Sequence, residues 1–523
     1  MGALLLEPKL SLGKLRARRY KAAILLSALL LIVVNWRRSC LPNYSYSYSY
    51  TNEDCTSLVV FTANMFIWGL LTPMALLIEA ITGKAIFAQR PCDSPDDGYH
   101  CHKDISRLWG PYSPYFAVDS EPIHGAGMDD YTNCRVTLVN VLSRHGARYP
   151  TDGAGRLING TLNKLKSQGT FSAKTGFIRD FKYTLGSDNL TTFGEKEMYN
   201  SGVKFYRRYK SLASDHDPFF RFSAQQRVID SGENFVQGFV DEKMKQTGKP
   251  PIPFPPPVLV YEGPRFNNTM DHGTCGKFEN STIASAAQTE FAAVFTKPII
   301  KWLKTEISGV DILPVDVISL MSLCPFYTIA QPTGDPLPKF CDLFTHREFE
   351  LYNYYLSLGK FYGYGPGNPL GPAQGIGYTN ELIARLTGTP VNDSTTTNTT
   401  LDSDPVTFPL GRKLYADFSH DNTMTSIFSA LNLFQGIANL STTTMDRDSK
   451  FNAAELVPFA SRMYVETLQC SDNKKEEFVR VIVNDRIMEL KACKGDGKGR
   501  CTVAAFVDSL QWARDGGNWA ECS

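Results

Sequence analysis

The sequence predicts an α/β fold, a central sheet flanked by helices, and a few short segments carry this prediction. Residues 134–143 (CRVTLVNVLS) are nearly continuously hydrophobic, which is typical of a strand buried inside a sheet. Residues 413–418 (KLYADF) are also strand-like, and residues 423–434 behind them show helical apolar spacing. Residues 222–226 precede a further helical pattern at 228–240. Strands that run directly into helices indicate an alternating α/β architecture.

The first strand leads into a cationic segment, Arg144-His145-Gly146-Ala147-Arg148. Ligand sites of open α/β sheets lie at the C-terminal ends of strands, and the forked guanidinium matches phosphate oxygens. Two neighbouring arginines should hold the imidazole of His145 neutral by charge repulsion. A neutral imidazole beside a bound phosphate monoester is a competent nucleophile. Gly146 would let the backbone approach the ligand closely.

Two further strand ends carry polar residues of the same kind. His420 and Asp421 follow the strand-like segment at 413–418, and Arg227 lies between a strand and a helix. Each signal alone is weak, because a histidine at a strand end more often has a structural role. Together they are stronger, since the C-terminal ends of neighbouring strands converge. The other six histidines lack this context, and we interpret them as surface or structural residues.

The connecting segments show no internal repeat and no clear boundary between independent domains. Residues 392–400 (NDSTTTNTT) are polar and predict a surface loop. Residues 250–257 (PPIPFPPP) predict a stiff connector.

The charge balance argues against nucleic acid as a partner. The chain has 523 residues and a net charge of +1, from 54 Lys+Arg and 53 Asp+Glu. Residues 1–90 hold ten of these basic and four of the acidic residues, which leaves 44 against 49 in the remainder. A slightly acidic body lacks the basic surface that binding to a phosphate backbone requires. A hydrophobic fraction of 43% excludes a disordered or collagen-like chain.

Cysteines and glycosylation sequons indicate an extracytoplasmic body. Ten of the twelve cysteines follow residue 90, and none forms a Cys-x-x-Cys pair. Disulfides are therefore favoured over zinc, and the sequence predicts no metal site. Seven asparagines after residue 90 begin Asn-x-Ser/Thr sequons: Asn159, Asn189, Asn267, Asn280, Asn392, Asn398 and Asn439.

Residues 1–90 are predicted to be a targeting or membrane-anchor region. Two uncharged runs, at 22–36 and within 57–78, are candidates for membrane association, and only the second is long enough to span a bilayer. The basic N-terminus favours the cytoplasm, whereas the cysteines and sequons place the body outside it. The chain must then cross the membrane an odd number of times. The second run is then a signal-anchor, or a signal sequence cleaved near Ala88. A true start at Met65 is a further alternative.

The motifs "LSRHGARYPTD" and "YADFSHDN" resemble those of the histidine acid phosphatases. The segments "RVIDSGENFVQGF", "FCDLFTHREFELYNYY" and "GNPLGPAQGIGYTNELIARLTGTPV" extend the likeness to filamentous-fungal phytases of the 3-phytase type. The resemblance covers residues 91–523 and does not cover residues 1–90.

The resemblance implies a phosphoglycerate-mutase-like sheet with an α-helical cap inserted roughly within residues 155–400. We expect the body to be monomeric, although the sequence itself does not determine the oligomeric state. The resemblance also implies that all ten body cysteines pair. The implied pairs are Cys92–Cys101, Cys134–Cys470, Cys275–Cys522, Cys324–Cys341 and Cys493–Cys501.

The resemblance further implies the chemistry of the site. His145 would attack phosphorus to form a phosphohistidine, and Asp421 would protonate the leaving alcohol. Arg144, Arg148 and Arg227, with His420, would hold the phosphate oxygens, and no cofactor would take part.

For the substrate, the resemblance implies phytate, which carries six phosphates. Arg179 and Lys182 are the basic residues expected to bind it, with Lys339 and Arg347 as lesser candidates. Two departures from the family pattern, at "TGDPLPKF" and "THREFE", weaken the expectation of phytate preference. The alternatives are a broad acid phosphatase and a catalytically silent, membrane-tethered inositol-phosphate binder.

Overall fold

The computed structural model describes residues 91–522, except for 119–130, 132, 251–253 and 472–475. The predictions for residues 1–90, including the runs at 22–36 and 57–78, lie outside the described residues. The described residues belong to one compact unit. Within this unit, no helix is long and apolar enough to cross a membrane.

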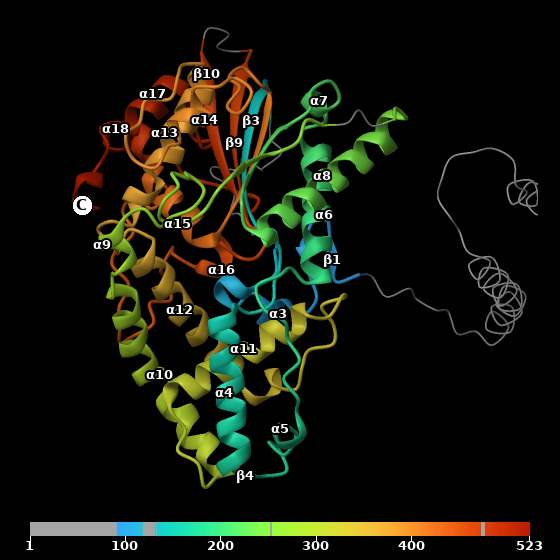
Figure 1. Cartoon of the computed structure of the whole chain (residues 1–523), viewed down its shortest axis with the longest axis vertical. Coiled ribbons are helices and arrows are strands. Elements are labelled where there is room, and N and C mark those ends of the chain that lie inside the picture. Colours follow the sequence, from blue (N-terminus) through green and yellow to red (C-terminus); the bar gives the residue numbers. More distant parts are fainter. Residues whose placement is uncertain (1–90, 119–130, 132, 251–253, 472–475, 523) are drawn as a thin grey trace, which may run out of the picture. The chain divides into compact units, whose positions relative to one another are not determined.

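A mixed sheet forms the centre of this unit, as the sequence predicts (Figure 1). Its strands run in the order β11-β10-β9-β3-β8-β5-β6, and β12 pairs with β10. The members β3, β8, β5 and β6 are parallel, whereas β9 and β10 continue the sheet in antiparallel fashion. The strands are β3 (Cys134–Arg144), β5 (Phe219–Ser223), β6 (Val258–Val260), β8 (Leu414–Ser419), β9 (Arg462–Cys470), β10 (Glu477–Val483), β11 (Arg486–Ile487) and β12 (Arg500–Thr502).

Helices cover both faces of the sheet because its central strands are apolar on both sides. Along β9, Met463 and Val465 enter one hydrophobic cluster, and Tyr464 between them enters the other. Figure 1 shows two helices on one side of the sheet, α6 (Thr192–Arg208) and α8 (Gln226–Thr247). On the other side lie α13 (Ile376–Thr387), α15 (Asp421–Ala430), α17 (Val503–Ser509) and α18 (Gln511–Arg514).

A second group of helices forms a cap away from the sheet (Figure 1). It contains α4 (Asp152–Gln168), α5 (Phe177–Asp180), α10 (Ile283–Glu306), α11 (Pro314–Ile329) and α12 (His346–Gly363). The range 155–400, proposed for the cap, also contains α6, β5, α8 and β6, which belong to the sheet layers. The cap elements are thus two separate groups in the sequence, on either side of these core elements.

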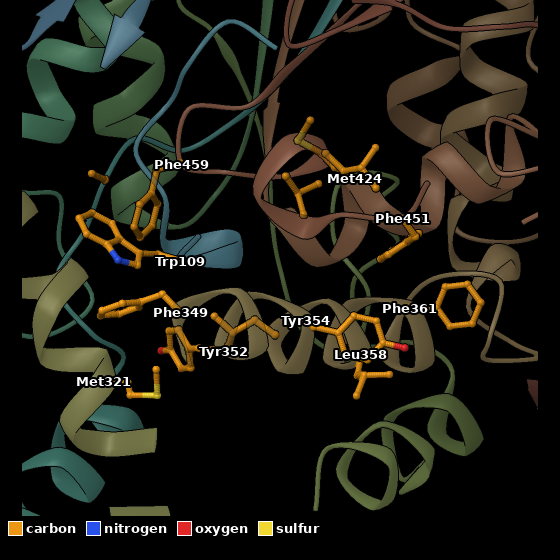
Figure 2. Packing of buried hydrophobic residues seen from close by; sticks show 14 of the residues in the cluster. Trp109, Met321, Phe349, Tyr352, Tyr354, Leu358, Phe361, Met424, Phe451 and Phe459 are labelled. Carbon is orange, nitrogen blue, oxygen red and sulfur yellow. The ribbon is translucent and has the colours of Figure 1, made fainter. Parts of the chain in front are cut away.

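Sheet and cap share one hydrophobic core. Figure 2 shows α12 between Met321 of α11 and Met424 of α15, with Phe459 near one end of the cluster. Thr345 begins α12 with a capping box, in which its hydroxyl accepts from the Glu348 amide and the Glu348 carboxylate accepts from the Thr345 amide. The cap is therefore fixed against the sheet and does not hang from a linker.

The remaining elements are short. The short strands are β1 (Asp93–Ser94), β2 (Gly98–Tyr99), β4 (Thr170–Phe171) and β7 (Ile307–Ser308). The short helices are α3 (Lys103–Ser106), α7 (Lys210–Ala213), α9 (Gly276–Glu279), α14 (Thr399–Asp402), α16 (Ala453–Leu456), η1 (Gly110–Tyr112), η2 (Cys341–Leu343), η3 (Pro372–Gly375), η4 (Lys491–Cys493) and η5 (Trp519–Cys522).

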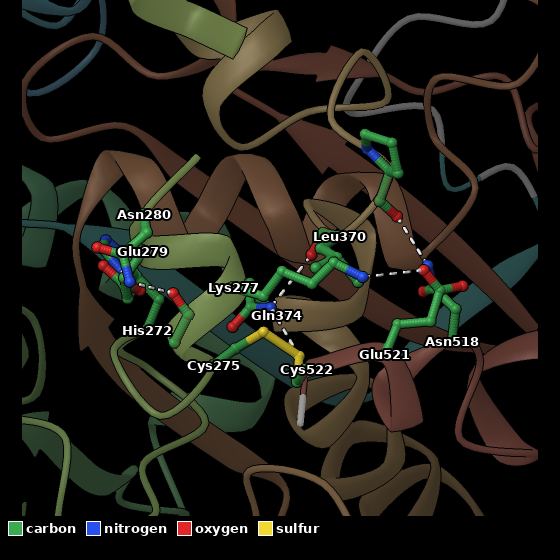
Figure 3. The surroundings of a disulfide bond; sticks show 12 residues. His272, Cys275, Lys277, Glu279, Asn280, Leu370, Gln374, Asn518, Glu521 and Cys522 are labelled. Carbon is green, nitrogen blue, oxygen red and sulfur yellow. Dashed lines mark hydrogen bonds and ion pairs between the residues drawn. A yellow bond between two sulfur atoms is a disulfide. The ribbon is translucent and has the colours of Figure 1, made fainter. Parts of the chain in front are cut away.

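All five expected disulfides are present, so the predicted pairing is confirmed. Figure 3 shows how Cys275–Cys522 joins the C-terminal end to the segment before α9. Beside it, the Gln374 amide donates to Leu370 O at 3.1 Å, and Lys277 pairs with Glu521 at 3.9 Å. A bond between residues 247 positions apart restricts the unfolded chain strongly, which stabilises the fold.

The polar segment at 392–400 is less exposed than the sequence predicts. It is irregular up to Asn398, but Thr395, Thr396 and Thr397 are buried. The Asp393 carboxylate accepts from the Thr395 amide and from the hydroxyls of Thr395 and Thr397, which removes the cost of burying them. The prediction of a surface loop was therefore wrong for its central residues.

Candidate active site

Three parallel strands bring the predicted residues to one edge of the sheet. The register pairs Arg144 at the end of β3 with Ser419 at the end of β8, and β5 lies on the other side of β8. His145 and His420 therefore follow neighbouring strand ends, and their ring centroids are 5.7 Å apart. Arg227 lies in the first turn of α8, directly after β5.

Backbone contacts fix the proton of the His145 imidazole. Its Nδ1 lies 2.8 Å from the carbonyl oxygen of Gly146, and because a carbonyl only accepts, Nδ1 carries the hydrogen. Nε2 then holds the free lone pair. Burial, together with Arg144, Arg227 and Arg148, lowers the pKa of His145 well below its ordinary value. The ring is neutral, as the sequence predicts, and Nε2 is available as a nucleophile.

Two of the three arginines, Arg144 and Arg148, are held by backbone carbonyls and by the Phe459 ring. Arg144 is fully buried, donates to the carbonyls of Pro111 and Val457, and lies 4.4 Å above the Phe459 ring. Arg148 donates to the carbonyl of Tyr149 at 2.8 Å, and its guanidinium lies 6.0 Å from the same ring.

Arg227 lies 3.8 Å from Asp188 in a loose ion pair. Within the described part of the chain, the Nε atoms of Arg144, Arg148 and Arg227 are buried without a hydrogen-bond partner. Buried guanidinium nitrogens that lack partners favour an anion between them.

Asp421 begins α15 and lies between two cations. Its carboxylate is 3.2 Å from Arg144 Nη2 and 2.7 Å from Lys360 Nζ. Burial by itself would raise the pKa of Asp421, but Arg144 and Lys360 outweigh it and hold the pKa well below its usual value. Asp421 is therefore an anion when no phosphate is bound.

His420 is held from the opposite side. Its Nε2 lies 2.7 Å from Glu262 Oε1, which also accepts from the Ser223 hydroxyl at 2.6 Å. Among the described residues, Glu262, Asp271 and His420 form one group with potential metal ligand atoms within 4.8 Å of one another. The hydrogen bond between His420 and Glu262 already uses two of these atoms.

The structure brings six of the predicted residues together, and it leaves two apart from them. Arg144, Arg148, Arg227 and His420 all lie close enough to His145 to act on its charge, and Asp421 pairs with Arg144. Arg179 and Lys182 are exposed, and α5, which carries Arg179, lies towards the far end of the cap in Figure 1. Arg179 lies 5.8 Å from the Phe171 ring, and no contact within the described residues joins it to the six.

The lesser candidates of the sequence show no contact with the six among the described residues. Arg347 pairs with Glu350 at 2.5 Å on the surface of α12, and Lys339 is exposed before η2. Sequence reasoning missed Lys360, Glu262 and Phe459, which contact the predicted residues directly. Lys360 and Glu262 stand in no motif. Phe459 lies in the segment "VPFASRMYVE", which resembles the family but gives no role to this one residue.

Comparison with known proteins identifies the family. The model of the histidine phosphatase superfamily (branch 2) matches residues 135–484. The chain belongs to this superfamily. Proteins named Phytase A from Aspergillus oryzae and Aspergillus awamori are 46% and 47% identical to it, over 88% of this chain and all of each relative.

Solved structures support the same fold for this superfamily member. The phytase from D. castellii superimposes with a TM-score of 0.65 at 23% identity, over 80% of this chain and 87% of that one. A multiple inositol polyphosphate phosphatase from Bifidobacterium longum, in complex with inositol hexasulfate, gives 0.57 at 14% identity, over 77% and 97% of the two chains. At these identities the likeness shows the fold alone.

Proposed function

We propose that this protein hydrolyses phosphate monoesters through a phosphohistidine, with His145 as the nucleophile. The observation that carries the proposal is the neutral imidazole, whose free Nε2 lies among guanidiniums with unpartnered nitrogens. Nε2 attacks phosphorus, the N–P bond forms, and the P–O bond to the leaving alcohol breaks. Arg144, Arg148, Arg227 and His420 neutralise the equatorial oxygens, which is most of what phosphoryl transfer requires.

Asp421 supplies the proton for the leaving oxygen. Arg144 and Lys360 hold the pKa of Asp421 low, and a bound phosphate dianion beside Arg144 opposes that effect. Substrate binding thus promotes protonation of Asp421, and the reaction favours acidic pH. In the second step a water attacks phosphorus, the N–P bond breaks, and the Asp421 carboxylate takes the proton of the water.

Phytate is the substrate we propose, because relatives that match 88% of this chain over their full length are named Phytase A. A hexakisphosphate brings five phosphates besides the one transferred, and these need cations outside the catalytic group. Arg179 and Lys182 remain the proposed contacts for them. The two alternatives, a broad acid phosphatase and a silent inositol-phosphate binder, are not favoured by these relatives.

We further propose that the body acts outside the cytoplasm. Five disulfides persist only in an oxidising compartment. The sequons at Asn159, Asn189 and Asn439 lie on exposed residues, where glycans fit. Whether residues 22–36 or 57–78 anchor the protein, or are removed with a signal sequence, belongs to this proposal and is decided by N-terminal sequencing of the mature protein.

The test is phosphate release from phytate at mildly acidic pH, with His145→Ala as the control. We expect release by the wild type and a loss of more than about 1000-fold in the variant. Activity on an aryl phosphate without activity on phytate would keep the mechanism and change the substrate. Substantial activity in a folded His145→Ala protein would overturn the nucleophile assignment.

A further inference from the structure

The peptide bond between Gly146 and Ala147 has hydrogen bonds on both sides. Its carbonyl oxygen accepts from His145 Nδ1 at 2.8 Å. Its amide, which belongs to Ala147, donates to Glu197 Oε2 at 2.9 Å. One rigid, planar unit therefore joins the nucleophile to a carboxyl group on α6.

Glu197 is placed for this contact and has a second anchor. It is 3% exposed, and its other oxygen, Oε1, accepts from the Tyr115 amide at 2.7 Å. A buried carboxyl that binds two backbone amides cannot rotate away without leaving both unpaired, which is costly.

The first turn of α6 is in direct contact with the loop that follows β3. Thr191, the residue before α6, donates its amide to Ala147 O at 3.0 Å. A Cβ on Gly194 would come within 1.9 Å of Ala147 O, so only glycine permits this approach. Ala147 O belongs to the next peptide, 147–148, so these contacts hold the loop against α6. Glu197 of the same helix binds the amide of the 146–147 peptide.

We propose that Glu197 is a positioning residue for the phosphoryl transfer, acting on His145 through the 146–147 peptide. By holding the Ala147 amide, Glu197 orients the Gly146 carbonyl, and that carbonyl keeps the hydrogen on Nδ1 and the lone pair on Nε2. Hydrogen bonds in such a chain polarise one another, so the amide contact also strengthens the carbonyl as an acceptor. This inference rests on the proposed role of His145.

The contact does not depend on a charge on Glu197. Burial and the neighbouring Asp93 raise the pKa of Glu197 to about 8, so the carboxyl is neutral at acidic pH. A neutral carboxyl keeps lone pairs on both oxygens. A glutamine, by contrast, offers one oxygen and one NH₂ group. Its oxygen can accept from only one of the two backbone amides, those of Tyr115 and Ala147, and its NH₂ group then faces the N–H of the other.

The experiment compares Glu197→Gln with the wild type on phytate and measures kcat, KM and inhibition by inorganic phosphate. We expect kcat to fall about 10- to 100-fold, the loss typical when the partner that orients a metal-binding histidine is removed. KM and the phosphate inhibition constant should change less than about threefold, because the guanidiniums are held by other contacts. Glu242→Gln is the matched control, since Glu242 is a buried carboxyl on α8 that pairs with Arg207 away from the loop.

Three outcomes would overturn the inference. One is an unchanged kcat in folded Glu197→Gln. Another is a loss of phosphate affinity equal to the loss in kcat, since Glu197 would then support the phosphate site as a whole. The third outcome applies even if the variant does not fold.

It comes from the NMR spectrum of the wild type labelled with ¹⁵N-histidine, in which His145→Ala assigns the signal of His145. We expect this residue to show a protonated Nδ1 and an unprotonated Nε2. The opposite tautomer would overturn the inference. An inactive wild type would instead refute the proposed function.

Discussion

The ends of β3 and β8 lie side by side, yet the structure holds them in different ways. After β3, neutral hydrogen bonds to the backbone fix the catalytic loop. The His145 amide donates to Ser419 O at 3.1 Å, the Gly146 amide to Ser231 Oγ at 3.1 Å, and the Ala460 amide to His145 O at 2.9 Å. After β8, ion pairs with Arg144 and Lys360 hold Asp421.

The difference follows from what each end must do. A nucleophile needs one fixed geometry, and neutral backbone contacts provide it over a wide pH range. A general acid must gain and lose a proton, so its partners are charged groups whose effect changes when a phosphate binds. We therefore expect substitutions at the β8 end to alter the pH dependence, and substitutions behind the β3 end to alter the rate at all pH values.

At the β8 end, the largest effect should come from Asp421→Asn. Without a proton donor, turnover of phytate should fall by about 100-fold or more, because the inositol oxygen would have to leave as an unprotonated alkoxide. An aryl phosphate with an activated leaving group should be slowed much less. Steady-state rates on the two substrates measure the difference, and equal slowing of both would contradict the general-acid role.

The contrast between the two ends also explains which residues the sequence could predict. The loop after β3 is contiguous, so Arg144, His145 and Arg148 are recognisable as one motif at a predicted strand end. His420 and Asp421 are recognisable for the same reason. Their partners come from distant segments: Lys360 lies 61 positions before Asp421, and Glu262 lies 158 positions before His420.

The cap was the less predictable half of the fold for a similar physical reason. Its helices alternate in sequence with the elements of the sheet, and helical periodicity does not say against which layer a helix packs. Glu197 illustrates this point. In the sequence it is one acidic residue of a helical pattern, and only the approach of α6 to the 146–147 peptide gives it a role.

A smaller effect, on pH dependence, should follow from Lys360→Gln. Lys360 helps to keep the pKa of Asp421 low, so its removal raises that pKa. The alkaline limb of the kcat profile, where the general acid loses its proton, should move to higher pH. Lys164→Gln is a suitable control, because Lys164 forms a similar ion pair with Asp316 in the cap. A limb that stays in place or moves to lower pH would contradict the assignment.

A still smaller effect is expected from Arg179→Ala and Lys182→Ala, which test the proposed contacts to the other phosphates of phytate. Each should raise KM for phytate by a few-fold at most, about the effect of one exposed ion pair, and leave an aryl phosphate unaffected. Lys301→Ala, another exposed cation of the cap, serves as the control. Unchanged KM in both variants would reduce these residues to ordinary surface charges.

The last prediction concerns the pH dependence of stability. It rests on two buried carboxyl groups with raised pKa values, Asp93 and Glu197, of which Glu197 contacts the loop after β3. Burial raises the pKa of Asp93 to about 6 and that of Glu197 to about 8. In the unfolded chain these groups titrate near about 4, so between about pH 4 and 8 the folded state binds more protons. The free energy of unfolding should therefore increase as the pH falls from about 8 towards 5, by at most about 1.4 kcal/mol per pH unit and per proton.

His145 opposes this trend below about pH 6.5 but does not reverse it. Burial and Arg144 lower the pKa of His145, so the folded state binds one proton fewer at this residue than the unfolded chain does. Asp93 and Glu197 bind up to two extra protons in the folded state and outweigh this single one between about pH 5 and 8.

Acidic residues with lowered pKa values do not cancel this trend in the same window. Asp421 and Asp417 are depressed by neighbouring cations, so their contribution to stability is lost only below the ordinary carboxyl range. Thermal unfolding followed between pH 5 and 8 should show a melting temperature that rises on acidification, and Glu197→Gln should flatten the slope. A melting temperature that rises with pH, or an unchanged slope in the variant, would mean that the carboxyl behind the catalytic loop is already ionised. The loop after β3 would then be held by a charge, as Asp421 is, and the contrast between the two strand ends would disappear.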